Sequence, residues 1–146
     1  MKKSCLQVIF FLLFSNALLL SGSDWPIWGG DGTRNMVSLE ESVTWSFKPG
    51  EMDADERVDL ETTENIKWVA KLGSQAYGNV TVANGKVFVG TNNESPRDPK
   101  KKGDRGVVMC LDEKTGKLEW QLVIPKLGAG KVSDWEYIGV CSSPAV

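Results

Sequence analysis

Residues 106–120 read GVVMCLDEKTGKLEW, and this stretch decides the fold that the sequence predicts. From Gly106 to Leu111 the residues are small or apolar, which is typical of a buried β-strand. Asp112 to Lys117 is polar and contains a glycine that can adopt a positive φ, which is typical of a tight turn. Leu118 to Ile124 is again mostly apolar, and we expect it to return beside the first strand.

A second hairpin is predicted immediately upstream. Tyr77–Ala83 and Lys86–Thr91 are rich in β-branched and aromatic residues. Asn84-Gly85 between them is a strong signal for a two-residue type I′ turn. A polar loop over residues 92–105 separates the two hairpins. Residues 77–124 therefore predict four antiparallel strands in chain order.

The sequence repeats beyond this unit. Ile66–Leu72 alternates apolar and polar residues, which predicts one more strand. Trp68 within it has a counterpart in Trp120, 52 residues later, and Gly78–Val82 has a counterpart in Ser142–Val146. A period of this length, with Trp and Gly at fixed places, indicates a repeat architecture.

This repeat predicts an all-β fold, a β-propeller of four-stranded antiparallel blades that cover one another's apolar faces. Residues 66–146 supply about one blade, plus edge strands and the start of a second blade. We therefore expect the chain to be an N-terminal fragment whose other blades lie beyond Val146. The alternative is a genuine short protein.

The first 23 residues predict a secretory signal peptide. Lys2 and Lys3 precede an apolar run over 6–20, and small residues precede Asp24, which favours cleavage after Ser23. The alternative is a membrane anchor, but the run is shorter than the roughly 20 residues that a spanning helix needs. We expect export to the periplasm.

Residues 24–65 follow as an N-terminal extension and acidic linker. Residues 51–64 carry many acidic residues and a single basic one, Arg57. This composition predicts a solvated loop without regular structure.

Composition excludes some classes of function for this stretch. The chain has no His, and therefore no histidine metal ligand or general base. The net charge of −2 provides no basic field, so we expect no nucleic-acid partner. Cys110 and Cys141 lie in apolar runs, where we expect small buried free thiols rather than a disulfide.

The stretch 106–120 resembles the repeat of pyrroloquinoline-quinone (PQQ) propellers. That repeat has Leu, Asp, Thr-Gly and Trp at set places, which here are Leu111, Asp112, Thr115, Gly116 and Trp120. Residues 84–91 resemble its first hairpin, and residues 24–36 resemble the start of large exported PQQ-repeat proteins of environmental bacteria such as planctomycetes. The resemblance implies eight blades in the complete protein, with Trp120 stacked on a peptide of the neighbouring blade.

The resemblance leaves three classes of function open. One is a scaffold that holds periplasmic or outer-membrane proteins, similar to the propeller of the outer-membrane β-barrel assembly machinery. The second is a dehydrogenase of alcohols or sugars that uses PQQ and calcium. The third is a propeller that binds a ligand or a polysaccharide.

For the dehydrogenase, Glu94 lies near the place of that family's calcium-binding Glu, and Arg105 is a second cofactor-binding candidate. Many PQQ enzymes carry adjacent cysteines, whereas here Ser142 follows Cys141. We therefore favour a binding propeller over an enzyme and assign no catalytic residue.

Two long connections, residues 92–105 and 125–140, are predicted to share one end of the blade, because connections alternate between the two ends of an antiparallel sheet. Functional residues concentrate on long loops held by a rigid scaffold. The alternative for the lysine run is a solvated loop tip. The predicted binding face comprises Glu94, Arg97, Asp98, Lys100, Lys101, Lys102, Asp104, Arg105, Asp134, Trp135 and Glu136.

Overall fold

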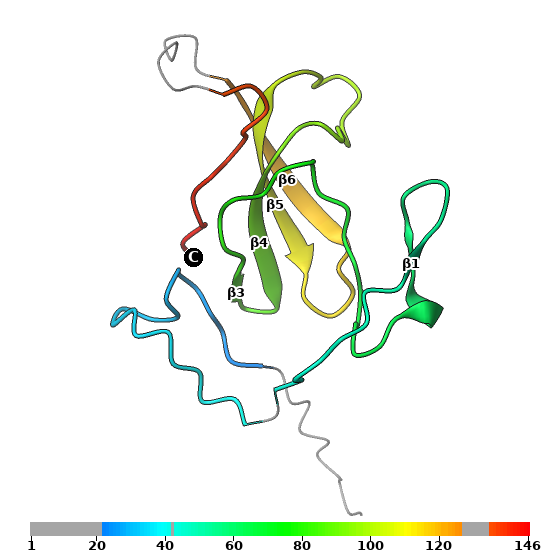
Figure 1. Ribbon diagram of the computed structural model, residues 1–146. Coiled ribbons are helices and arrows are strands. Elements are labelled where there is room, and N and C mark those ends of the chain that lie inside the picture. Colours follow the sequence, from blue (N-terminus) through cyan, green and yellow to red (C-terminus); the bar gives the residue numbers. More distant parts are fainter. Residues whose placement is uncertain (1–21, 42, 127–134) are drawn as a thin grey trace, which may run out of the picture.

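The computed structural model describes residues 22–41, 43–126 and 135–146 (Figure 1). Within them, four antiparallel strands form the main sheet in chain order. These strands are β3 (Thr81–Ala83), β4 (Lys86–Asn92), β5 (Arg105–Asp112) and β6 (Leu118–Pro125). The predicted all-β class and the four-stranded antiparallel sheet are confirmed.

Both predicted turns are present. Asn84 and Gly85 have φ values of 53° and 72°, and Ala83 pairs with Lys86, as a two-residue turn with two left-handed positions requires. In the other turn the Asp112 carboxylate accepts bonds from the Thr115 hydroxyl at 2.6 Å and the Thr115 amide at 2.8 Å. These two bonds hold the pKa of Asp112 below its ordinary value.

The main sheet buries one face. Val87, Val89, Val107, Met109 and Leu111 alternate along β4 and β5 and form the core. The segment that covers this core supplies three half-buried apolar side chains, Trp68, Ala70 and Leu72.

The predicted strand over Ile66–Leu72 is wrong. Its alternation comes from packing one side of the segment on the sheet, and no strand of the described residues pairs with it. The predicted strand over Tyr77–Ala83 is shorter than expected and begins at Thr81. Before Thr81 the backbone is held differently, because the Asn79 amide donates to Ser143 Oγ at 2.8 Å.

The opposite face of the sheet is only partly covered. Val140 lies so close to Gly90 and Gly106 that a Cβ on either glycine would approach it within 2.8 Å. Farther out, β6 leaves large apolar side chains open, with Trp120 46%, Leu122 55% and Ile124 39% exposed. Their partners on β5 are Cys110, Val108 and Gly106, so all three side chains project from this second face.

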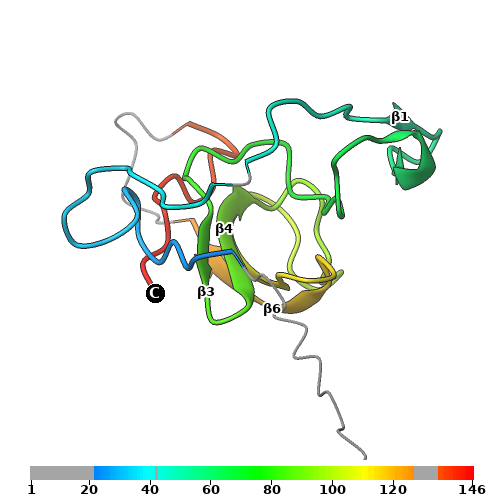
Figure 2. The ribbon, with the colours of Figure 1, turned by 90° about the horizontal axis from the view of Figure 1, so that it is seen from below.

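The acidic segment is structured, contrary to prediction. It contains β1 (Glu51–Met52), β2 (Val58–Asp59) and the 3₁₀ helix η1 (Leu60–Thr62), which stand apart from the main sheet (Figure 2). The turn between β1 and β2 forms because the Asp53 carboxylate accepts hydrogen bonds from the backbone amides of Asp55 and Arg57 at 2.9 and 2.8 Å. Acidic side chains here build a turn, although their composition alone favours a loop.

The N-terminal extension is joined to the edge of the main sheet. Trp25 and Val82 exchange two backbone hydrogen bonds of 2.7 and 3.0 Å. Residues 1–21 of the predicted signal peptide lie outside the residues that the structure describes. In the described part, no helix is long and apolar enough to cross a bilayer.

Both described cysteines are free thiols, as predicted. Cys110 is buried, also as predicted. Cys141 is exposed, so the expectation of burial is wrong there.

Candidate functional site

Residues 92–105 of the first long connection and the described parts of the second, residues 125–126 and 135–140, lie together at one end of the main sheet, and the two short turns lie at the other end (Figure 1). Side-chain bonds join the long connections. Asn92 Nδ2 donates to the Tyr137 carbonyl at 2.6 Å, and Lys126 Nζ pairs with Asp104 Oδ2 at 2.7 Å. The Tyr137 amide also donates to the Asp104 carboxylate, and the Val140 amide donates at 3.3 Å to the carbonyl of Thr91 in β4. The predicted shared end is confirmed.

Asn92 is the centre of this end. It is buried at the end of β4, and its side-chain oxygen accepts the amides of Ser74 and Glu94 at 3.0 and 3.3 Å. Its side-chain nitrogen donates to Ser74 Oγ at 2.9 Å as well as to Tyr137. One buried amide therefore joins three segments that are distant in sequence.

Asn93 fixes the first long connection from within. It is 5% exposed, and its Nδ2 donates to the carbonyls of Lys101 at 2.7 Å and Gly103 at 3.1 Å. Asp98 accepts the Lys101 amide on its carbonyl and the Lys100 amide on its carboxylate. The backbone of the lysine run is therefore held, although its side chains are exposed.

Neither asparagine was among the predicted site residues. The only signal was a polar pair directly after an apolar strand, which does not reveal bonds to residues 45 positions away.

The two cofactor-binding candidates do not come together. Glu94 is exposed, and its carboxylate accepts a short bond from the Ser74 hydroxyl and a 3.5 Å contact from Asn92 Nδ2. Arg105 is half-buried, and its Nε donates to the Lys102 carbonyl at 2.9 Å. No bond joins Glu94 to Arg105 within the described ranges.

The surroundings of Glu94 do not fit a calcium ion. Calcium takes six to eight oxygen ligands, several of them carboxylates. The groups bonded to Glu94 are one hydroxyl and one amide, and the described residues contain no group of three or more acidic or cysteine side chains placed for a metal.

Several residues of the predicted binding face have internal partners. Arg97 turns inward, where its guanidinium contacts Met109 Sδ at 3.2 Å and bonds the Lys71 carbonyl, and burial lowers its pKa. The Lys126 ammonium and the Tyr137 amide lower the pKa of Asp104. Asp98 caps the lysine loop. These three residues hold the face together.

Other residues of the predicted face remain open to solvent. The side chains of Lys100, Lys101 and Lys102 are exposed, and so are Trp135 and Glu136. Asp134 lies outside the described residues.

The repeat motif surrounds a tryptophan contact. Leu111 is in the core, and Asp112, Thr115 and Gly116 form the turn that follows it. The Trp68 ring lies on this turn, 2.5 Å from the position that a Cβ on Gly116 would occupy. Trp68 Nε1 also donates to the Glu113 carbonyl at 2.8 Å.

Trp120 itself contacts Phe88, with ring centroids 6.1 Å apart, and remains half exposed on β6. The stack on a neighbouring peptide that the resemblance implies for Trp120 is not formed within the described residues. Its counterpart Trp68 instead lies on the turn between β5 and β6 of this same sheet.

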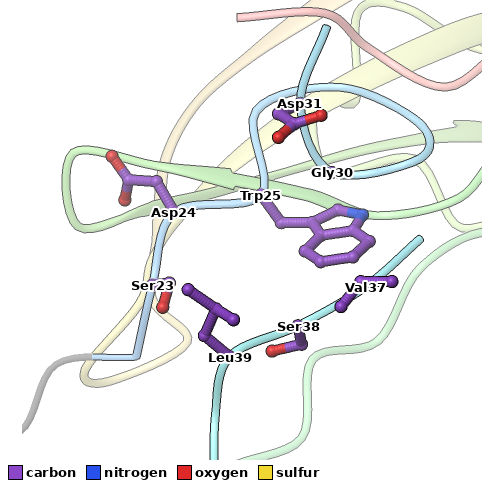
Figure 3. A pocket seen from close by; sticks show the side chains of 8 residues that line it. All are labelled: Ser23, Asp24, Trp25, Gly30, Asp31, Val37, Ser38 and Leu39. Atoms are coloured by element: carbon purple, nitrogen blue, oxygen red, sulfur yellow. The ribbon is translucent and has the colours of Figure 1, made fainter. Parts of the chain in front are cut away.

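A separate pocket of about 170 Å³ lies at the N-terminal extension (Figure 3). The Trp25 ring lies over Val37 there, and Asp24 points away from the ring. Asp24 accepts the Asn84 amide at 3.2 Å, and the Asp31 carboxylate accepts both Thr33 donors, which lower its pKa. Both carboxylates serve the chain's own backbone, so the pocket offers less for a ligand than the long-connection end.

Comparison with protein-family models, curated proteins and solved structures finds no match to this chain.

Proposed function

We propose that this chain is part of an exported PQQ-repeat β-propeller that binds partner proteins or ligands at its long-connection end. The observation that best supports a repeat is the contact of Trp68 with Gly116 and with the Glu113 carbonyl. Trp120 is the counterpart of Trp68 and leaves its ring half exposed. A second turn of the same kind, on the next repeat, is the partner that Trp120 fits.

The end of the chain supports the same proposal. Ser142–Val146 is the counterpart of Gly78–Val82, and the two segments lie beside each other where they begin, because a Cβ on Gly78 would come within 2.5 Å of the Ser142 carbonyl oxygen and the Asn79 amide donates to Ser143 Oγ. At their ends both segments bond to the N-terminal extension, Val82 to Trp25 and Val146 to Pro26. The first strands of neighbouring blades are adjacent around a propeller axis. Val140, which precedes this segment, covers part of the open sheet face, where a next blade would pack.

Binding fits the long-connection end better than catalysis. Asn92 and Asn93 fix the connections, so this end presents side chains at low entropic cost, as binding surfaces on rigid scaffolds do. The surroundings of Glu94 do not supply calcium ligands, so we do not extend the proposal to the dehydrogenase. The partners would be periplasmic or outer-membrane molecules, reached after removal of the signal peptide.

A loop replacement tests the binding proposal. The complete exported protein is immobilised and exposed to periplasmic extract, alongside a variant in which Asn-Gly replaces residues 93–105. Asn92 and Gly106 already pair, so a two-residue turn can close the strands. We expect the variant to lose the captured molecules and Lys114→Ala, at the opposite end, to retain them. Equal capture by both variants, or no capture by the natural protein, contradicts the proposal.

A further inference from the structure

The long-connection end concentrates positive charge on an acidic protein. Residues 93–105 hold five cationic and three acidic side chains, whereas the mature chain after Ser23 has 15 basic and 19 acidic residues. Of the three acids, Asp104 is paired with Lys126, Asp98 caps the loop backbone, and Glu94 accepts a bond from the Ser74 hydroxyl. Lys100, Lys101, Lys102 and Arg105 therefore form a local cationic cluster.

The cluster is held in place before any ligand binds. The carbonyls of Lys101 and Gly103 are bonded to the buried Asn93, and the Lys102 carbonyl is bonded to Arg105 Nε. A loop tip that serves only solubility needs no such buried anchor. Because the loop backbone is already ordered, less conformational entropy is lost when its lysines engage a partner.

An exposed tryptophan lies on the neighbouring long connection. Trp135 is 70% exposed, and its carbonyl accepts a 3.1 Å bond from Lys126 Nζ, which also pairs with Asp104. Asp104 directly precedes Arg105, so this ammonium joins the tryptophan segment to the cationic loop. An indole offers a flat apolar face on which the C–H face of a sugar ring can pack.

We propose that this end of the molecule binds an acidic polysaccharide, a polymer of uronate-type sugars. Lys100, Lys101 and Lys102 contact its carboxylates, Trp135 packs on a sugar ring, and Asn93 is a positioning residue. An acidic peptide could pair its carboxylates with the lysines, but it would have no sugar ring to pack on Trp135. The inference rests on the proposed function, because it names the ligand class of the same binding end.

Binding to polygalacturonate tests the inference, with dextran as the uncharged control polymer and poly-glutamate as the charged control without sugars. Affinity is measured by calorimetry on the full chain at low and moderate salt. We expect the triple variant Lys100→Ala, Lys101→Ala, Lys102→Ala to weaken polygalacturonate binding at least about tenfold at low salt. We also expect a shallower dependence on salt, because fewer counterions are released.

Matched variants distinguish the contributions of the lysine charges, the Trp135 ring and the ordered loop backbone to binding. Trp135→Ala should weaken polygalacturonate binding about threefold or more and leave poly-glutamate binding unchanged. Asn93→Ala should weaken polygalacturonate binding without removing a charge. The double variant Lys114→Ala, Lys117→Ala, at the short-turn end, should bind like the natural chain. Circular dichroism checks that each variant is folded.

Three outcomes overturn the inference: no binding of polygalacturonate at low salt, binding that the triple variant does not weaken, or poly-glutamate binding as tight as polygalacturonate. If periplasmic capture still depends on residues 93–105 in any of these cases, the proposed function stands and only the ligand class is wrong. If that dependence is also absent, both fail.

Discussion

Gly116 is subject to two independent constraints at the residue scale. Its φ is 70°, and the Trp68 ring occupies the space of a Cβ at 2.5 Å. Gly85 has nearly the same φ, 72°, but nothing lies within 4 Å of the Cβ position. An alanine at Gly85 would therefore meet only backbone strain, whereas an alanine at Gly116 would meet the same strain and a clash with the Trp68 ring.

We predict that Gly85→Ala destabilises the chain by about 1 kcal/mol through left-handed strain alone. Gly116→Ala should cost about 3 kcal/mol, because the Trp68 ring must also move. Urea unfolding followed by tryptophan fluorescence measures both free energies of unfolding. Equal losses for the two variants would show that Trp68 does not lie on Gly116.

Trp68 and Trp120 make a second matched pair. Trp68→Phe should cost about 1 kcal/mol for the lost bond to the Glu113 carbonyl. Trp120→Phe should be close to neutral in this chain, because no hydrogen bond of the Trp120 indole is found among the described residues and Phe preserves the contact with Phe88. Thermal unfolding compares the pair, and a larger loss for Trp120→Phe would contradict the assignment of contacts.

The Asp112 turn predicts a pH dependence. The folded-state pKa of Asp112 is lowered by Thr115, so its contribution to stability is complete above the ordinary carboxylate range and is lost as pH falls through the lowered pKa. Thr115→Val should raise the pKa of Asp112, whereas Thr115→Ser should keep it low. NMR titration of the carboxylate measures the pKa. The stability difference between the natural chain and Thr115→Val should vanish in acid, and a difference that persists there would contradict this origin.

Local chemistry explains which single residues were predictable. Asn84-Gly85 and Asp112 act on neighbours within three positions, so their turns could be predicted from the sequence. Asn92 and Asn93 act on partners up to 45 residues away, and no local pattern identifies such bonds. The long-connection end was therefore predicted by topology, while the residues that organise it were not.

At the scale of elements, the hydrophobic pattern predicted which segments are buried better than it predicted which segments pair as strands. The runs that became β4, β5 and β6 were predicted within one or two residues. Ile66–Leu72 has the same alternation but no ladder, because one apolar side suffices to pack on a sheet. The β1–β2 hairpin was missed because its turn depends on Asp53 bonding nearby amides.

The β1–β2 hairpin is predicted to be separable from the main sheet. Its hydrogen bond to the sheet-covering segment is an exposed pair between Glu56 and Lys71 at 2.7 Å, a kind of contact that contributes less than about 1 kcal/mol. Lys48 and Glu64 already face each other through two backbone bonds. Replacing residues 49–63 with Asn-Gly should therefore lower the melting temperature only slightly. Loss of cooperative unfolding would show that the hairpin supports the sheet.

At the scale of the whole molecule, the sheet has two apolar faces and two different coverings. Residues 66–72 cover the face with Met109, while the face with Leu122 is covered only near Val140. The sequence could predict the four-stranded unit, because each strand and turn is local. It could not predict how the two faces are covered, because residues 66–72 and Val140 reach the sheet through contacts between segments that are distant in sequence.

Sequencing the reading frame beyond codon 146 tests whether this four-stranded unit is one of several in a repeat. We predict a continued frame with further Leu-Asp, Thr-Gly and Trp units, the next Trp following Trp120 at a spacing near the 52 residues between Trp68 and Trp120. A stop codon directly after Val146, or a continuation without such units, would contradict it.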